Sequence, residues 1–248
     1  DFEDPLGLTI PAYFAFLASA YMNRYNISEA DLAEFAVLMR SNAARHPKAH
    51  KRALITVDDV LASRPIADPL KLLDCCLISD GGCALVVGKE AGSHNPVRIA
   101  GSAQSHPYQH VLAAPNLTEY KSSKALDAAL AEAKVERDQL EIACIYDSYT
   151  ITVLAFLEDL GLAPRGKAAQ LCREGYFSPT GKLPLNTHGG LMSFGHSGVA
   201  GGLAHINEVY RQMAGKAGDR QFGNPKTGLV HGEGGIFASQ ISLVFKQG

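Results

Sequence analysis

Residues 186–202, NTHGGLMSFGHSGVAGG, give the clearest indication of how this chain folds. The segment contains six glycines around His196 and runs into residues 203–210, whose apolar spacing predicts a helix. A glycine-rich turn that opens a helix holds a side chain beside free backbone N–H groups, a common site for anions. The segment therefore predicts an imidazole that is placed to stabilise negative charge on a thioester or enolate oxygen.

The first 70 residues have the spacing of a helical region. Pro11 suits the first turn of a helix, and Ser28 suits the N-cap of a second one. Residues 56–61 are typical of a short capped helix, and residues 64–69 of an extended connector. We expect the following side chains of the first two helices to face inward: Phe14, Leu17, Ala18, Tyr21, Leu32, Phe35 and Met39.

Strand patterns begin after residue 79 and alternate with helices. Residues 142–146 form a short apolar run that leads into helical residues 150–157, and such alternation is typical of α/β domains. Ser122 or Ser123 is expected to cap a further helix that ends at Ala133. The remaining predicted strands are residues 83–87, 97–101, 227–230 and 236–245.

Composition and charge exclude several classes of protein. The 248 residues allow one large domain or two smaller ones, and a net charge of −2 gives no global field to recruit nucleic acid or an anionic membrane. Residues 142–160 are apolar but contain three carboxylates, so they are no membrane span, and no signal peptide is evident. The five cysteines follow no zinc-ligand or C-x-x-C spacing, so we expect reduced thiols, a cytoplasmic protein and no metal site.

Two further segments carry side chains that are suited to proton transfer. Residues 146–149, YDSY, follow a predicted strand, and ligands of α/β sheets collect at the carboxyl ends of strands. Residues 231–235, HGEGG, place a histidine beside glycines, and imidazole titrates near neutral pH without perturbation. Structural roles stay open, since His196 could simply bond a carbonyl and Tyr146 could pack at a strand end.

The glycine-rich loop around His196 is similar to the G-H-P-x-G loop of the thiolase superfamily, with Ser197 where proline usually stands. Residues 146–149 resemble its N-E-A-F or H-D-C-F motif, with Tyr146 at the histidine and Ser148 at the cysteine. A serine hydroxyl does not exchange protons at neutral pH without a strong base beside it, unlike a thiol. The departure favours Ser148 as a small filler or helix cap rather than a nucleophile.

Residues 231–235 resemble the C-x-G-G-G loop of thiolases, with His231 at the cysteine position and Glu233 at that of the first glycine. Three similar loops in the order of the superfamily make a specific resemblance. It extends over nearly the whole chain, and it points to lipid-transfer-protein-like or sterol-carrier-type thiolases and to thiolase-like aldolases. His231 would then be a candidate proton carrier.

The resemblance implies an α/β fold of the layered αβαβα thiolase type, with the first strands and the nucleophilic cysteine missing before Asp1. We expect residues 1–70 to form a helical lid region, residues 71–116 the end of the N-terminal half, and residues 117–248 the C-terminal thiolase domain. A longer protein is expected, because a strand at residues 83–87 would otherwise lack partners and leave an apolar edge open.

The resemblance also implies a site. Loop histidines beside glycines are often solvated turn residues, and a solvated helix end explains a basic cluster as well as phosphate binding does. The candidate catalytic residues are His196, Tyr146, His231 and His188. The candidate contacts to coenzyme A are Arg40, Arg45, Lys51, Arg52 and Ser193.

The activity that the resemblance implies is carbon–carbon bond formation or cleavage next to an acyl-CoA thioester. Thiolytic acyl transfer requires the missing cysteine, whereas retro-aldol cleavage of a β-hydroxyacyl-CoA with a fatty or steroid side chain does not. The departures at Ser148, Ser197 and His231 leave a third possibility, a non-catalytic acyl-CoA-binding subunit. The resemblance further implies a homodimer, a CoA thioester as substrate with no bound cofactor, and a small CoA-binding partner built from a zinc ribbon and an OB-fold.

Overall fold

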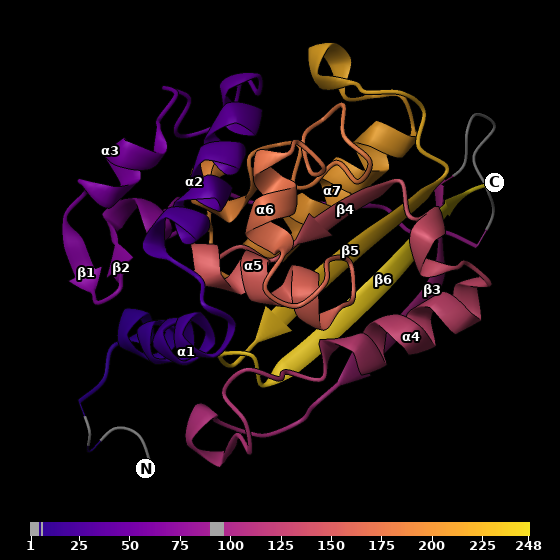
Figure 1. The fold of residues 1–248 in the computed structure, drawn as a ribbon. Coiled ribbons are helices and arrows are strands. Elements are labelled where there is room, and N and C mark those ends of the chain that lie inside the picture. The colour runs from indigo at the N-terminus through magenta and orange to yellow at the C-terminus, as the bar shows by residue number, and fades with distance from the viewer. Residues whose placement is uncertain (1–4, 6, 90–96) are drawn as a thin grey trace.

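The computed structural model describes residue 5, residues 7–89 and residues 97–248. A four-stranded sheet in the order β3-β6-β5-β4 lies at its centre, with helices packed around it (Figure 1). Strand β4 runs parallel to β5, and the other neighbours are antiparallel. The strands are β3 (Val97–Ser105), β4 (Ile142–Ile145), β5 (Thr227–Gly234) and β6 (Ser239–Gln247).

The two faces of this sheet pack on different helices, because successive side chains of a strand point in opposite directions. Ile145 and Leu229 belong to the core shared with α5 (Thr150–Asp159), a helix whose residues are all buried. Cys144 belongs to a second core on the other face, which is shared with α7 (Ala200–Met213). The alternation in β4 therefore decides which side chains can reach the α7 side of the sheet.

The N-terminal helices form where the sequence predicts them. Helix α1 spans Ile10–Tyr25 with Pro11 in its first turn, α2 spans Glu29–Ala44, and α3 spans Val57–Leu61. Ser28 caps α2 with a reciprocal capping box, and a second such box begins α3. The side chains that were expected to face inward are all buried: Phe14, Leu17, Ala18, Tyr21, Leu32, Phe35 and Met39.

The expected connector at residues 64–69 is extended at residues 65–67, and these residues pair in a small antiparallel hairpin. Its strands are β1 (Pro65–Ala67) and β2 (Leu70–Lys71), and an ion pair between Lys71 and Glu29 fastens it to the start of α2. The remaining short helices are η2 (Leu72–Asp74), η3 (Val111–Ala113), η4 (Arg137–Gln139), α6 (Ala168–Arg173), the π-helical turn η5 (Gly190–Phe194) and η6 (Gly218–Arg220).

The expected cap of helix α4 (Ser122–Ala133) was wrong. The N-cap residue is Lys121 in a left-handed conformation, and no hydroxyl of Ser122 or Ser123 caps the helix. The N–H of Ser122 donates to Asp159 Oδ2 at 2.7 Å instead. A carboxylate from the neighbouring helix α5 thus performs the capping, which no local sequence pattern could indicate.

Two strand predictions also need correction. Residues 83–87 pair with no strand in the part of the chain that the structure describes, and the Val86 and Val87 side chains are exposed. An isolated strand has no partner for its backbone groups, so apolar composition alone does not produce one. Strand β6 begins at Ser239 rather than at Ile236, because Ile236 has a positive φ of 58° and belongs to the preceding turn.

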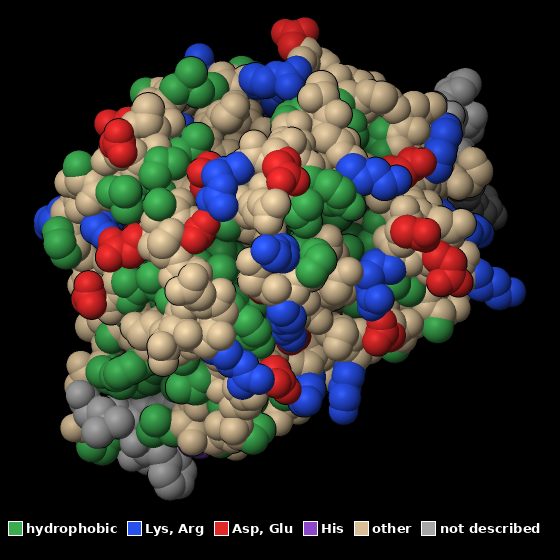
Figure 2. Space-filling view, viewed as in Figure 1, with side chains coloured by type: hydrophobic (Ala, Val, Ile, Leu, Met, Phe, Trp, Pro, Cys, Tyr) green, Lys and Arg blue, Asp and Glu red, His purple; other side chains and the backbone are tan. Residues whose placement is uncertain are grey.

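The surface carries both signs of charge. On the face that Figure 2 shows, Lys and Arg side chains are interspersed with Asp and Glu side chains and do not gather into a field of one sign. Within the described ranges, none of the helices has the combination of length and apolarity that is needed to cross a bilayer.

Candidate active site

Tyr146 and His196 meet at the end of β4. The N–H of Tyr146 donates to the carbonyl of His231 at 2.9 Å, which continues the strand register by one residue. His196 lies in the loop between η5 and α7. Its Nε2 is 2.8 Å from Tyr146 Oη, and the two rings meet edge to face with an interplanar angle of 78°. The structure therefore brings together two of the predicted site residues from distant segments.

Burial sets the protonation state of this pair. It lowers the pKa of the His196 imidazole and raises the pKa of the Tyr146 hydroxyl, to which the nearby Glu233 carboxylate also contributes. The imidazole is therefore neutral and the phenol protonated at neutral pH. In the tautomer whose Nε2–H donates to Tyr146 Oη, the phenol proton is free to donate to an oxygen of a substrate.

Ser79 fixes the loop that carries His196. Its N–H donates to the carbonyl of His196 at 2.9 Å, and its Oγ accepts from the N–H of His196 at 3.3 Å. The same Oγ lies 3.1 Å from Nδ1 of His50. Residues from the N-terminal region thus form one hydrogen-bonded frame with the glycine-rich loop.

Asp147 positions the loop from the other side. Its carboxylate is fully buried and accepts from the N–H of Leu191 at 2.8 Å and from that of Met192 at 3.4 Å. Burial raises the pKa of this carboxyl well above its usual range. Gly190 is required here, because it has a φ of +61° and an added Cβ would lie 2.0 Å from Asp147 Oδ2. The sequence analysis placed Asp147 in a motif but assigned it no role.

The structure does not bring His231 to the Tyr146–His196 pair. His231 lies within β5 opposite Ile145, so its side chain points to the α5 face, where its ring packs against Phe156. Its Nδ1 is 2.9 Å from Ser242 Oγ, and its Nε2 is 3.1 Å from Gln240 Oε1. Burial lowers its pKa to about 4. Tyr146 is one residue beyond Ile145 and therefore points to the opposite face.

His188 is an interior residue. It is 2% exposed, and its ring packs against Phe194 and His205 at centroid distances of 5.2 and 5.1 Å. Burial lowers its pKa to about 3, so the imidazole is neutral. These two ring contacts are with residues other than Tyr146 and His196.

Glu233 is a candidate that the sequence analysis noted only as a departure from a glycine triplet. Burial raises the pKa of its carboxyl to about 7, and the carboxylate accepts from the N–H of Phe237 at 2.7 Å. A carboxyl that titrates near neutral pH is suited to take and return protons. Its charge also raises the pKa of Tyr146, but the alternation of β5 directs the Glu233 side chain to the same face as His231. The signal that could have indicated it is a single carboxylate among glycines, in a segment that the structure shows to be the end of β5.

The residues proposed to contact coenzyme A are divided between the interior and the surface. Arg40 and Ser193 are buried and bond each other, with Nε of Arg40 donating to Ser193 Oγ at 3.0 Å. The backbone N–H of Lys51 donates to the carbonyl of Ser193 at 3.0 Å, and this leaves the exposed Lys51 side chain in solvent. Arg45 and Arg52 line a pocket of about 390 Å³ beside η6. The two surface arginines are thus better placed for phosphates than the buried Arg40.

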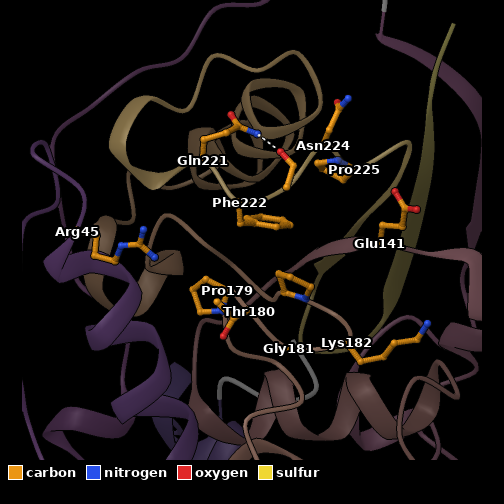
Figure 3. Close-up of a pocket in the computed structure, with 12 residues that line it drawn as sticks. Arg45, Glu141, Pro179, Thr180, Gly181, Lys182, Gln221, Phe222, Asn224 and Pro225 are labelled. Atoms are coloured by element: carbon orange, nitrogen blue, oxygen red, sulfur yellow. Dashed lines mark hydrogen bonds between the residues drawn. The ribbon is translucent and has the colours of Figure 1, made fainter.

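Arg45 also borders a second pocket, of about 500 Å³ (Figure 3). In this view Arg45 approaches from the end of α2, the Phe222 ring lies in the middle, and Glu141 and Lys182 border the far side. The lining does not include Tyr146 or His196. This pocket is therefore separate from the candidate catalytic pair.

Comparison with known proteins places this geometry in context. Residues 103–247 match the family model for "Thiolase C-terminal domain-like" proteins. The acetyl-CoA acetyltransferase of Methanothermobacter thermautotrophicus is 31% identical over 100% of this chain and 66% of its own length. The steroid side-chain-cleaving aldolase of Thermomonospora curvata is 35% identical over 84% of this chain and 56% of its own length.

A solved structure shows the same fold. The Ltp2-ChsH2(DUF35) aldolase superposes with a TM-score of 0.84 at 29% identity and covers 98% of this chain and 65% of that chain. The expected thiolase-like α/β fold is thus confirmed. The chain spans 66% of the length of the acetyltransferase and 65% of the aldolase chain, which is less than two thirds of each.

Proposed function

This chain belongs to the thiolase family. We propose that it forms part of an acyl-CoA enzyme that makes or breaks a carbon–carbon bond next to a thioester. The observation that carries the proposal is the 2.8 Å contact between Tyr146 Oη and His196 Nε2. Chemistry beside a thioester passes through an enolate, which needs donors for its oxygen and a group that carries a proton. A neutral imidazole with a phenol beside it can supply both.

The position of the pair supports these roles. His196 lies a few residues before the N-terminal end of α7, where backbone N–H groups and the helix dipole favour an anionic oxygen. We assign stabilisation of the enolate oxygen to His196 and this backbone. Tyr146 takes or returns the proton at the reacting carbon or oxygen, and Asp147 acts as a positioning residue because it holds the loop.

The state of the thiols favours retro-aldol cleavage as a second candidate function. Burial raises the pKa of Cys75, Cys76 and Cys172 to about 12 and the pKa of Cys144 well above its usual range. These thiols stay protonated at neutral pH and are poor nucleophiles. Thiolytic acyl transfer would need a thiolate other than these four.

Retro-aldol cleavage of a β-hydroxyacyl-CoA needs no thiolate. A base removes the β-hydroxyl proton, a carbonyl forms at the β-carbon, the bond to the α-carbon breaks, and its electron pair becomes the enolate of the acyl-CoA. The enolate then takes a proton at its α-carbon. Tyr146, which lies beside His196 at the end of β4, is the candidate proton carrier for these two transfers.

The assembly and the ligands belong to the same proposal. We propose a CoA thioester as the substrate, with no resident organic cofactor, and a homodimer as the functional state. A small CoA-binding partner with a zinc ribbon and an OB-fold is proposed for the aldolase activity, since the similar solved structure is named as an Ltp2-ChsH2(DUF35) aldolase. The cysteines that the structure describes are all free, which supports a reducing cytoplasmic setting.

The test uses the full protein with two substrates. A 3-oxoacyl-CoA with free CoA reports thiolysis, a β-hydroxyacyl-CoA reports retro-aldol cleavage, and mass spectrometry identifies the products. His196→Ala and Tyr146→Phe should each lower turnover by roughly 10²–10³-fold, the typical effect of losing an oxyanion donor or a proton carrier. The matched controls His106→Ala and Tyr210→Phe alter a histidine and a tyrosine in other parts of the chain and should retain the wild-type rate.

Each result has one interpretation. Unchanged rates in both site variants would refute the proposed roles of this pair. Turnover of the hydroxyacyl substrate alone selects the aldolase, and turnover of the oxoacyl substrate alone selects the thiolase. Tight acyl-CoA binding by calorimetry with neither turnover would instead identify a non-catalytic binding subunit.

A further inference from the structure

Buried side chains of types that bind metal ions form a cluster near the candidate site, where the His205 ring centroid is 6.4 Å from that of Tyr146. We propose that Cys144, His188 and His205 bind a metal ion of the zinc class. One ligand atom from each residue lies within 4.8 Å of the other two. The three side chains are 0%, 2% and 1% exposed, so the cluster is a closed internal site rather than a surface patch.

Three firmly held elements supply these residues. Cys144 belongs to β4, and His205 belongs to α7, which packs on the same face of the sheet. His188 follows Asn186, whose side chain donates to the carbonyl of Ile145 at 2.8 Å and accepts from its N–H at 2.8 Å. The loop is thus fastened to the residue next to Cys144. A site built on anchored elements keeps its ligands in place before the metal binds.

The histidine rings provide an independent observation. Neither ring nitrogen of His188 and neither ring nitrogen of His205 has a hydrogen-bond partner among the residues that the structure describes. Buried polar atoms are nearly always paired, because leaving them unpaired is unfavourable. Two adjacent imidazoles whose ring nitrogens make no hydrogen bond, next to a thiol, are the arrangement expected for a metal site.

The donor set selects the metal. Two imidazole nitrogens and one thiolate suit Zn²⁺ and related late transition metals, and they do not suit Ca²⁺ or Mg²⁺, which prefer oxygen. Tetrahedral zinc places its ligand atoms roughly 3.5 Å apart, so a separation of up to 4.8 Å closes by small side-chain rotations. When the ion binds, Cys144 releases its thiol proton to solvent and coordinates as the thiolate.

Asp147 connects this cluster to the catalytic loop. Its Oδ1 is 3.5 Å from His205 Nε2, in a geometry that makes no hydrogen bond, and it accepts from the N–H of Leu191. A divalent cation bound here would favour the ionised form of this buried carboxyl, which accepts the loop hydrogen bonds. The metal would therefore stabilise the loop that presents His196, without contacting a substrate.

The test measures metal content and does not depend on activity. The full protein is unfolded in denaturant in the presence of a chelator and refolded with or without Zn²⁺. It is then desalted, and its zinc content is measured by elemental analysis. We expect about one zinc per chain and, at a hundredfold excess over Kd, a melting temperature raised by roughly 5–10 °C. Refolding with Co²⁺ should give a thiolate-to-cobalt charge-transfer band and the visible bands of tetrahedral coordination.

Two variants identify the ligands. Cys144→Ser should abolish the charge-transfer band and most zinc retention, whereas Cys172→Ser, which changes a thiol in α6, should retain both. His205→Asn should likewise lose zinc, and the cobalt spectrum of the wild type tests the site even if this variant fails to fold. Absence of zinc from the refolded wild type, or equal retention by Cys144→Ser, would overturn the proposal.

Discussion

Replacement of Gly190 by alanine tests the link between Asp147 and the catalytic loop. Gly190 has a φ of +61°, and its added Cβ would lie 2.0 Å from Asp147 Oδ2. A left-handed conformation disfavours alanine by about 1 kcal/mol relative to glycine. The carboxylate must also move away, which breaks its bonds to the N–H groups of Leu191 and Met192. Two buried donors left without an acceptor destabilise the fold by roughly a further 2–4 kcal/mol. We therefore expect the free energy of unfolding to fall by about 3–5 kcal/mol.

Urea unfolding followed by circular dichroism measures this loss. With a slope of about 2 kcal/mol per molar urea, the midpoint of Gly190→Ala should fall by roughly 2 M. Gly202→Ala is the matched control, because Gly202 lies in the first turn of α7 and its added Cβ would meet no atom within 4 Å. The free energy of unfolding of that variant should equal that of the wild type or exceed it by up to about 1 kcal/mol. A Gly190→Ala midpoint equal to that of the control would refute the assigned role of Asp147.

Three further substitutions have defined outcomes. Ser28→Ala removes a capping box with Asp31 and should lower the free energy of unfolding by about 1 kcal/mol, measured by the same denaturation. In the wild type, burial raises the pKa of the Glu233 carboxyl from 4.5 to about 7, so the free energy of unfolding should fall by up to about 3 kcal/mol as pH rises from 4.5 to above 7. Glu233→Gln removes this carboxyl. The variant should lose that part of the pH dependence, and equal slopes in the two proteins would contradict burial as the cause. Gly101→Ala would place a Cβ 2.0 Å from the carbonyl of Ala129 and should lower the melting temperature by more than about 5 °C, whereas an unchanged value would show that α4 can shift freely.

The N-terminal helices were predictable because their signals are local. Pro11 in a first turn and Ser28 at an N-cap act within single turns, and both appear in the structure as expected. The errors arose where distant residues decide the outcome. The cap of α4 comes from Asp159, and residues 83–87 find no strand partner among the described residues.

The candidate site was predictable in part. The resemblance of three loops to those of the thiolase superfamily implied that Tyr146 and His196 share a site, and the structure places them in contact. It could not place His231, because strand register decides which face a side chain reaches, and register depends on tertiary pairing. The catalytic roles of these residues remain predictions. The cluster around Cys144 had no sequence signature, since its members come from a strand, a loop and a helix.

The outer edge of β4 is closed by its own polypeptide. The N–H of Ala143 donates to the carbonyl of Pro184 at 3.0 Å, and its carbonyl accepts from the N–H of Asn186 at 3.0 Å. The Asn186 side chain hydrogen-bonds with both the N–H and the carbonyl of Ile145. No incoming strand can hydrogen-bond there. Within the described ranges β3 pairs with β6 alone, so any strand that lengthens the sheet, whether from this polypeptide or another, must join at β3.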